Sequence, residues 1–173
     1  MKLKLLLFIV SILIAGIILI ISLASSIRGG SVSPREYLDA GLLFHSKIIP
    51  GHILYPLFVF RDKYQLFQAS EYDQFSLRLH FAQIRLMYAS ELLDVHVPEL
   101  SASTIKKTQH YAFSSQKYIY QDEQRRQLIE FFTQFQEFLK MHKDEYPDEQ
   151  KAVLDNIFTE NHYLLLQLQE YKQ

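Results

Sequence analysis

The most pronounced pattern along the chain is an uncharged apolar run near its amino end. Residues 5–23 are LLLFIVSILIAGIILIISL, without one charged side chain. A helix of this length, rising about 1.5 Å per residue, spans about 28 Å, close to the thickness of the hydrocarbon layer of a bilayer. We therefore predict a transmembrane helix here, with residues 1–26 acting as a signal anchor.

A cleavable signal peptide is the competing interpretation of this run. Lys2 and Lys4 give it a charged start, and SLASS at residues 22–26 offers small residues for a peptidase. The apolar part of a signal peptide usually has only about 7–15 residues, however, and this run is longer. The leading lysines also favour an amino end in the cytoplasm. We expect a single-pass protein of the cell membrane, with residues 27–173 outside the cytoplasm.

Beyond the run, composition changes before helical patterning begins. Residues 27–35, IRGGSVSPR, contain two glycines, two serines and a proline, which is typical of a flexible tether. Residues 36–173 are expected to form the extracytoplasmic domain.

The first clear amphipathic helix of that domain is expected to begin at Pro56. The ring of a proline suits the first helical position, where its missing N–H would have no partner. Spacings of three and four residues then place Leu57, Phe60, Tyr64 and Phe67 on one face of the helix.

A second helix is expected from Ser70, whose hydroxyl can accept a hydrogen bond from the Asp73 amide, to the break at Pro98. Its apolar surface is wide enough to contact two partner helices. Two neighbouring stripes make up this surface: Leu77, Phe81, Ile84, Tyr88, Leu92 and Val95, and beside them Leu79, Ala82, Leu86, Ala89 and Leu93.

Three further helices follow in the pattern. One is expected from Ser101 or Ser103 to about Gln121, one carries a phenylalanine-rich stripe, and one follows the turn at Pro147. No segment shows period-two alternation with hairpin signals. The predicted fold is all-α: the transmembrane helix, then an antiparallel bundle of about four to five helices whose Phe, Leu and Ile side chains supply the core. The stripe of the phenylalanine-rich helix contains Leu128, Phe131, Phe132, Phe135, Phe138, Leu139 and His142.

Three segments carry a resemblance to a known family: PGHILYPL at 50–57, RDKYQLF at 61–67 and LRLHFAQIRLMYASELL at 77–93. They resemble a bacterial extracytoplasmic domain of unknown function, with a P-G-x-x-L-Y-P-x-K-x-x-x-E start and an L-x-L-x-x-A-x-x-R-L helix. The resemblance implies an extracytoplasmic helical domain and no particular chemistry. The matching residues are Pro50, Gly51, Leu54, Tyr55, Pro56, Leu77, Leu79, Ala82, Arg85 and Leu86.

Two positions of the first helix depart from the family pattern. Phe58 stands where the family has lysine, and Asp62 replaces its glutamate, so an ion pair between residues i and i+4 of the helix is lost. The resemblance also implies that Tyr55 and Pro56 form a fixed entrance to this helix, with Tyr55 fastening it to the core.

Composition excludes several classes of function. A formal net charge of −1 argues against a nucleic-acid partner, because such proteins normally carry a basic excess. The chain has no cysteine, so it forms no disulfide and carries no lipid on a thiol. It also lacks a Gly-x-Ser-x-Gly motif and a glycine-rich phosphate loop. We expect neither a cofactor nor an enzyme, with an envelope hydrolase as the remaining alternative.

Histidines and carboxylates supply a weak metal candidate. No His-x-x-x-His pair occurs, and the nearest local grouping is Asp94, His96 and Glu99 in DVHVPE. The competing interpretation is a polar helix end before Pro98.

Tyrosines supply a candidate contact surface. The chain has 13 Phe and 11 Tyr but no Trp, and Tyr111, Tyr118 and Tyr120 fall outside the apolar stripe of their helix. Tyrosine suits recognition surfaces because its ring buries area while its hydroxyl stays hydrated. We expect an interaction or sensing module whose candidate partner is an envelope protein. A bundle studded with tyrosines but without a partner, and a metal or small-ligand site, are the alternatives.

Overall fold

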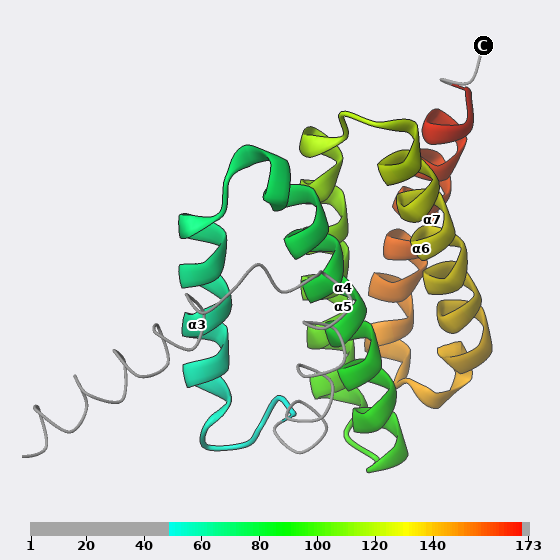
Figure 1. The fold of residues 1–173 in the computed structure, drawn as a ribbon. Coiled ribbons are helices and arrows are strands. Elements are labelled where there is room, and N and C mark those ends of the chain that lie inside the picture. Colours follow the sequence, from blue (N-terminus) through cyan, green and yellow to red (C-terminus); the bar gives the residue numbers. More distant parts are fainter. Residues whose placement is uncertain (1–48, 171–173) are drawn as a thin grey trace, which may run out of the picture. The chain divides into compact units, whose positions relative to one another are not determined.

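Five α-helices and two short 3-10 helices make up residues 49–170, which are the part of the chain that the computed structural model describes (Figure 1). This range contains no strand, so the predicted all-α fold and the number of helices are confirmed. The predicted transmembrane helix, signal anchor and tether lie outside the described residues. No helix between residues 49 and 170 combines the length and the apolar character needed to cross a membrane.

Short connections join consecutive helices, so that chain neighbours run in opposite directions (Figure 1). The 3-10 helix η1, Gln116–Tyr118, extends α5, and η2, Lys143–Glu145, follows α6. The five α-helices are α3, Tyr55–Gln68; α4, Glu71–Asp94; α5, Pro98–Ser115; α6, Asp122–His142; and α7, Asp148–Glu170.

The first helix is entered through a tight turn at Pro50 and Gly51. Gly51 has a φ of 99°, a left-handed conformation in which a side chain is strained. A Cβ atom at this position would also lie 3.1 Å from Cδ2 of Leu100 on α5. The amide of Tyr55 then donates to the carbonyl of His52 at 2.9 Å. The Pro-Gly pair therefore supplies both the turn and the close approach to α5.

Helix α4 begins and ends with well-defined caps. The Asp73 amide donates to the Ser70 hydroxyl, which confirms the predicted start. At the other end His96 adopts a φ of 59°, its amide donates to the Leu93 carbonyl, and the Val97 amide donates to the Leu92 carbonyl. These two bonds form a Schellman motif with His96 at the left-handed position, which is usually glycine.

Helix α5 begins earlier and ends earlier than the sequence pattern predicted. Pro98 occupies its first turn, where a missing N–H costs nothing, so the prediction of a start at Ser101 or Ser103 is wrong. Ser101 is instead fully buried: its hydroxyl donates to the Ala89 carbonyl at 2.7 Å and shares a hydrogen bond with the Tyr146 hydroxyl, also at 2.7 Å. The α-helix ends at Ser115 rather than near Gln121, because the last turn tightens into η1.

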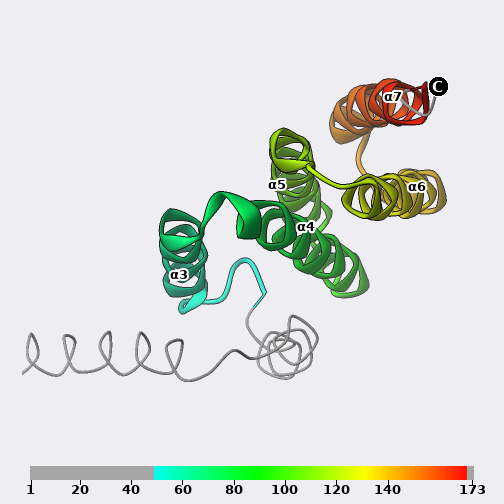
Figure 2. The same cartoon turned by 45° about the horizontal axis from the view of Figure 1, so that its top comes forward.

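The main hydrophobic core lies among α4, α5, α6 and α7, and no residue of α3 belongs to it. Phenylalanine rings from α6 fill its centre, where Phe131 contacts both Phe132 and Phe135, and Phe113 of α5 lies against Phe132. Figure 2 shows α3 on one side of α4 and the pair α6 and α7 on the other. The core thus holds four helices together, whereas α3 is attached from outside through α4.

Candidate interaction surface

Helix α3 turns an apolar face away from the bundle. We call Leu57, Phe60, Tyr64 and Phe67 the α3 face; their exposed fractions are 60%, 63%, 40% and 87%. The sequence pattern placed these four side chains together on one face, but its general expectation that Phe and Leu side chains supply the core does not hold for Leu57, Phe60 and Phe67. Ile53 and Leu54, just before the helix, are exposed as well and extend the same apolar character. Exposed apolar patches of this kind mark contact sites in soluble domains.

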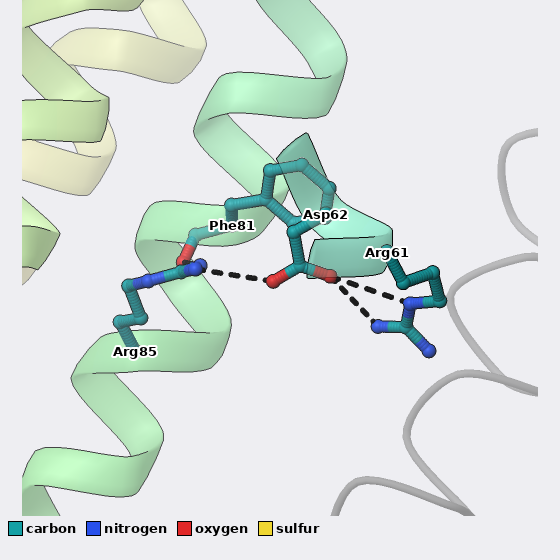
Figure 3. A network of polar contacts seen from close by, with 4 residues as sticks. All are labelled: Arg61, Asp62, Phe81 and Arg85. Carbon is teal, nitrogen blue, oxygen red and sulfur yellow. Dashed lines mark hydrogen bonds and ion pairs between the residues drawn. The ribbon is translucent and has the colours of Figure 1, made fainter. Parts of the chain in front are cut away.

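The orientation of α3 is explained by a buried carboxylate on its opposite side. Asp62 is the only buried residue of the helix. One carboxylate oxygen accepts from Arg85 of α4 at 3.1 Å, and the other accepts from Arg61 at 2.9 Å (Figure 3). A carboxylate in the interior requires such partners, since an unpaired buried charge is very costly. Pairing with Arg85 therefore turns the Asp62 side of α3 inward and the apolar face outward.

Arg85 is itself enclosed by α4 and α5. Only 3% of it is exposed, and Nη1 donates to the Phe81 carbonyl at 3.1 Å (Figure 3). The guanidinium lies 4.2 Å from the ring centre of Tyr111, a cation–π contact. Its Nε has no hydrogen-bond partner. Asp62 is thus the one anion in a site that is otherwise made of rings and a carbonyl group.

Aromatic contacts complete the junction between α3 and α4. The ring of Tyr55 meets that of Tyr88 edge to face, with centroids 6.3 Å apart, so Tyr55 fastens the start of α3 to α4 rather than to the main core. Burial, followed by the Asp62 charge, raises the pKa of Tyr88. Burial also raises the pKa of Tyr55, although the Arg85 charge opposes this shift. Both hydroxyls therefore stay protonated at neutral pH.

The family-like residues fall into three groups in the structure. Pro50, Gly51 and Pro56 form the turn and the start of α3, and Leu54 is 45% exposed. Ala82 is fully buried in the main core and Leu86 packs beside that core. Tyr55 and Arg85 meet in the junction between α3 and α4.

The ion pair between Asp62 and Arg85 escaped the sequence analysis. The sequence pattern indicated only that a pair within α3 is lost, whereas the structure shows Asp62 paired with an arginine 23 positions away on another helix. A signal was available: Asp62 is the only acidic residue of α3, and it lies on the side opposite the apolar stripe.

The three candidate tyrosines lie in different surroundings. Tyr111 is half-buried, because its ring covers the Arg85 guanidinium and meets Phe81 edge to face. Tyr118 is half-buried too, with the guanidinium of Arg78 5.2 Å from its ring centre. Only Tyr120 of the three is largely exposed, at 59%. Of the predicted surface, therefore, Tyr120 alone offers a full ring to a partner.

The candidate metal ligands do not converge. Asp94, His96 and Glu99 are all exposed at the junction of α4 and α5. Among the residues of the described range, no group of three His, Asp or Glu side chains is placed to hold a metal ion. The position of His96 is explained by its part in ending α4.

Two shallow depressions lie on the side of α5 and α7, with volumes of about 440 and 460 Å³. Phe113, Tyr163 and Leu164 contribute to the first, and Lys106, Gln109 and Asn156 to the second. None of the site residues predicted from the sequence lines either one. Both are open to solvent, so they resemble grooves between helices rather than enclosed pockets.

The junction and the α3 face together offer a surface suited to noncovalent binding. The charged groups are neutralised inside, and the surface above them offers apolar and aromatic side chains. Comparison of the chain with protein-family models, with curated proteins and with solved structures finds no match.

Proposed function

We propose that this protein is a membrane-anchored, extracytoplasmic helical module that works by surface contact, as an interaction or sensing element of the cell envelope. One observation carries the proposal: α3 keeps its apolar face in solvent while its polar side is locked inward by the ion pair between Asp62 and Arg85. An apolar face exposed at the expense of core area is typical of a binding surface.

The uncharged run at residues 5–23 supports the anchor, and Lys2 and Lys4 before it support the orientation. The absence of cysteine from the chain makes both testable by labelling. In the Tyr163→Cys variant, the new thiol replaces an exposed ring on α7. We expect a membrane-impermeant maleimide to label it in intact cells, and the protein to stay in the membrane fraction after alkaline carbonate washing. Labelling only after lysis would contradict the orientation, and extraction by carbonate would contradict the anchor.

Photo-crosslinking in cells tests the contact itself. A photoreactive residue at Phe60 samples the α3 face, one at Tyr120 samples the tyrosine surface, and one at Tyr163 serves as an exposed control. We expect position 60 to give a recurrent adduct, with a lipid or with an envelope protein, that position 163 does not give. A recurrent adduct from position 120 alone would instead favour the tyrosine surface, and equal background at all three positions would contradict a contact function.

A further inference from the structure

The outward half of α3 has an unusual distribution of charge. Asp62, its only acidic residue, is buried and paired, so the outward half has no negative side chain. Lys63 is exposed at the edge of the α3 face, one turn from both Phe60 and Phe67. Arg61 lies toward the other edge, where Asp62 and the ring of Phe58 hold it. The α3 face is thus an apolar stripe with positive charge at its margins.

This pattern is that of a helix lying in a membrane interface. Such helices place Phe and Leu in the boundary between headgroups and acyl chains, while lysine and arginine reach the anionic headgroups. Tyrosine is also favoured at that depth, because its ring is apolar and its hydroxyl remains hydrated. Tyr64 fits this description, since its hydroxyl accepts a hydrogen bond from Gln68 at 2.7 Å at the surface.

The position of α3 in the chain also favours contact with a membrane. It is the first helix of the described range, and residues 24–54 are all that separate it from the uncharged run. A chain anchored through that run keeps α3 near the bilayer at a high effective concentration, so that even a weak affinity for lipid suffices for contact.

We propose that the α3 face rests on the anionic surface of the bilayer that holds residues 5–23. This inference rests on the proposed membrane anchor and identifies what the exposed face contacts. Because α6 and α7 lie on the other side of α4, this contact turns them away from the lipid (Figure 2). The module is thereby oriented, with α3 as its base.

Lipid contact can be measured at single positions, because any cysteine introduced into this chain is unique. The full-length protein is prepared with Phe60→Cys or Phe67→Cys and, as matched controls, with Tyr163→Cys or Leu166→Cys on exposed positions of α7. Each variant carries an environment-sensitive dye and is reconstituted into vesicles of phosphatidylcholine and phosphatidylglycerol, with or without brominated acyl chains. Flotation of the vesicles is measured first, and circular dichroism confirms the fold.

We expect the emission at positions 60 and 67 to shift to the blue and to lose intensity with brominated lipid, whereas positions 163 and 166 do neither. Adding Lys63→Glu to the Phe67→Cys variant is expected to weaken this quenching. If the protein floats but all four labels are equally exposed to water, the α3 contact is wrong and the anchor stands. If the protein does not float, both are wrong. A signal at position 60 that changes on dilution with unlabelled protein would place a second copy on the face and overturn the lipid contact.

Discussion

Two single residues, Gly51 and His96, occupy left-handed backbone conformations for different reasons. Gly51 meets a steric demand from Leu100, and a glycine has no Cβ to clash. His96 meets no such demand, because it ends α4 at a position where glycine is the usual choice. The same backbone geometry therefore predicts opposite effects of substitution at the two sites.

Gly51→Ala is expected to lower the free energy of unfolding by about 1–2 kcal/mol. The new methyl group adds the strain of a left-handed alanine and a close contact with Leu100. Urea unfolding followed by far-UV circular dichroism measures the loss. Gly51→Ala with unchanged stability would show that the turn relaxes without cost.

His96→Gly is expected to raise the free energy of unfolding by about 1 kcal/mol, because glycine adopts this conformation without strain. His162→Gly is the matched control: it makes the same chemical change at an exposed position inside α7, where replacing histidine by glycine lowers the free energy of unfolding by about 0.3–0.5 kcal/mol. Changes of opposite sign in the free energy of unfolding of the two variants would confirm the role of His96. A loss of stability in both variants would contradict it.

At the scale of the elements, hydrophobic spacing predicted which helices exist but not which way α3 faces. The start of α4 at Ser70 and the buried stripe of α6 followed directly from residues near each other in sequence. The orientation of α3 depends on Asp62 and Arg85, whose pairing is a long-range event that periodicity does not encode. Spacing groups side chains on a face, whereas tertiary contacts decide whether that face is buried.

Removing Asp62 is expected to destabilise the protein more than removing Arg85. Asp62→Leu leaves the Arg85 guanidinium buried without an anion, at a cost of about 3–5 kcal/mol. Arg85→Met is milder, because Arg61 still pairs with Asp62. The double variant should lose less than the sum of the two single losses. Unfolding of all four proteins tests this, and strictly additive losses would show that the two charges are not coupled.

At the scale of the whole bundle, a second buried polar link joins Ser101 of α5 to Tyr146 after α6. Burial raises the pKa of Tyr146 to about 12, although the Ser101 hydrogen bond opposes the shift. The unfolded chain ionises this phenol near its usual pKa of 10.0, before the folded protein does. Stability contributed by the neutral hydroxyl is therefore complete below pH 10 and is lost as the pH rises toward about 12.

We accordingly expect the free energy of unfolding to fall between those pH values, by about 1.4 kcal/mol per unit where only the unfolded tyrosine is ionised. Tyr146→Phe should flatten this decline, leaving the part due to Tyr55 and Tyr88, whose pKa values are raised too. Tyr163→Phe, at an exposed ring, should not change it. The measurement is the urea midpoint across the alkaline range, and identical profiles for all three proteins would contradict the assignment.

The absence of α3 from the main core also affects how the protein opens. Helices α4 to α7 share buried phenylalanine and leucine side chains, whereas α3 is held by the ion pair between Asp62 and Arg85, a hydrogen bond from Gln74 to the Leu66 carbonyl, and partly buried rings. Local opening requires less free energy where fewer apolar contacts are broken, so the amides of α3 should exchange with deuterium before those of α4 and α6. A surface that binds the folded α3 raises the free energy of this local opening by its own binding free energy. The amides of α3 can therefore gain or lose protection while the other four α-helices remain folded. The exchange rate of α3 thus shows directly whether its exposed face is bound.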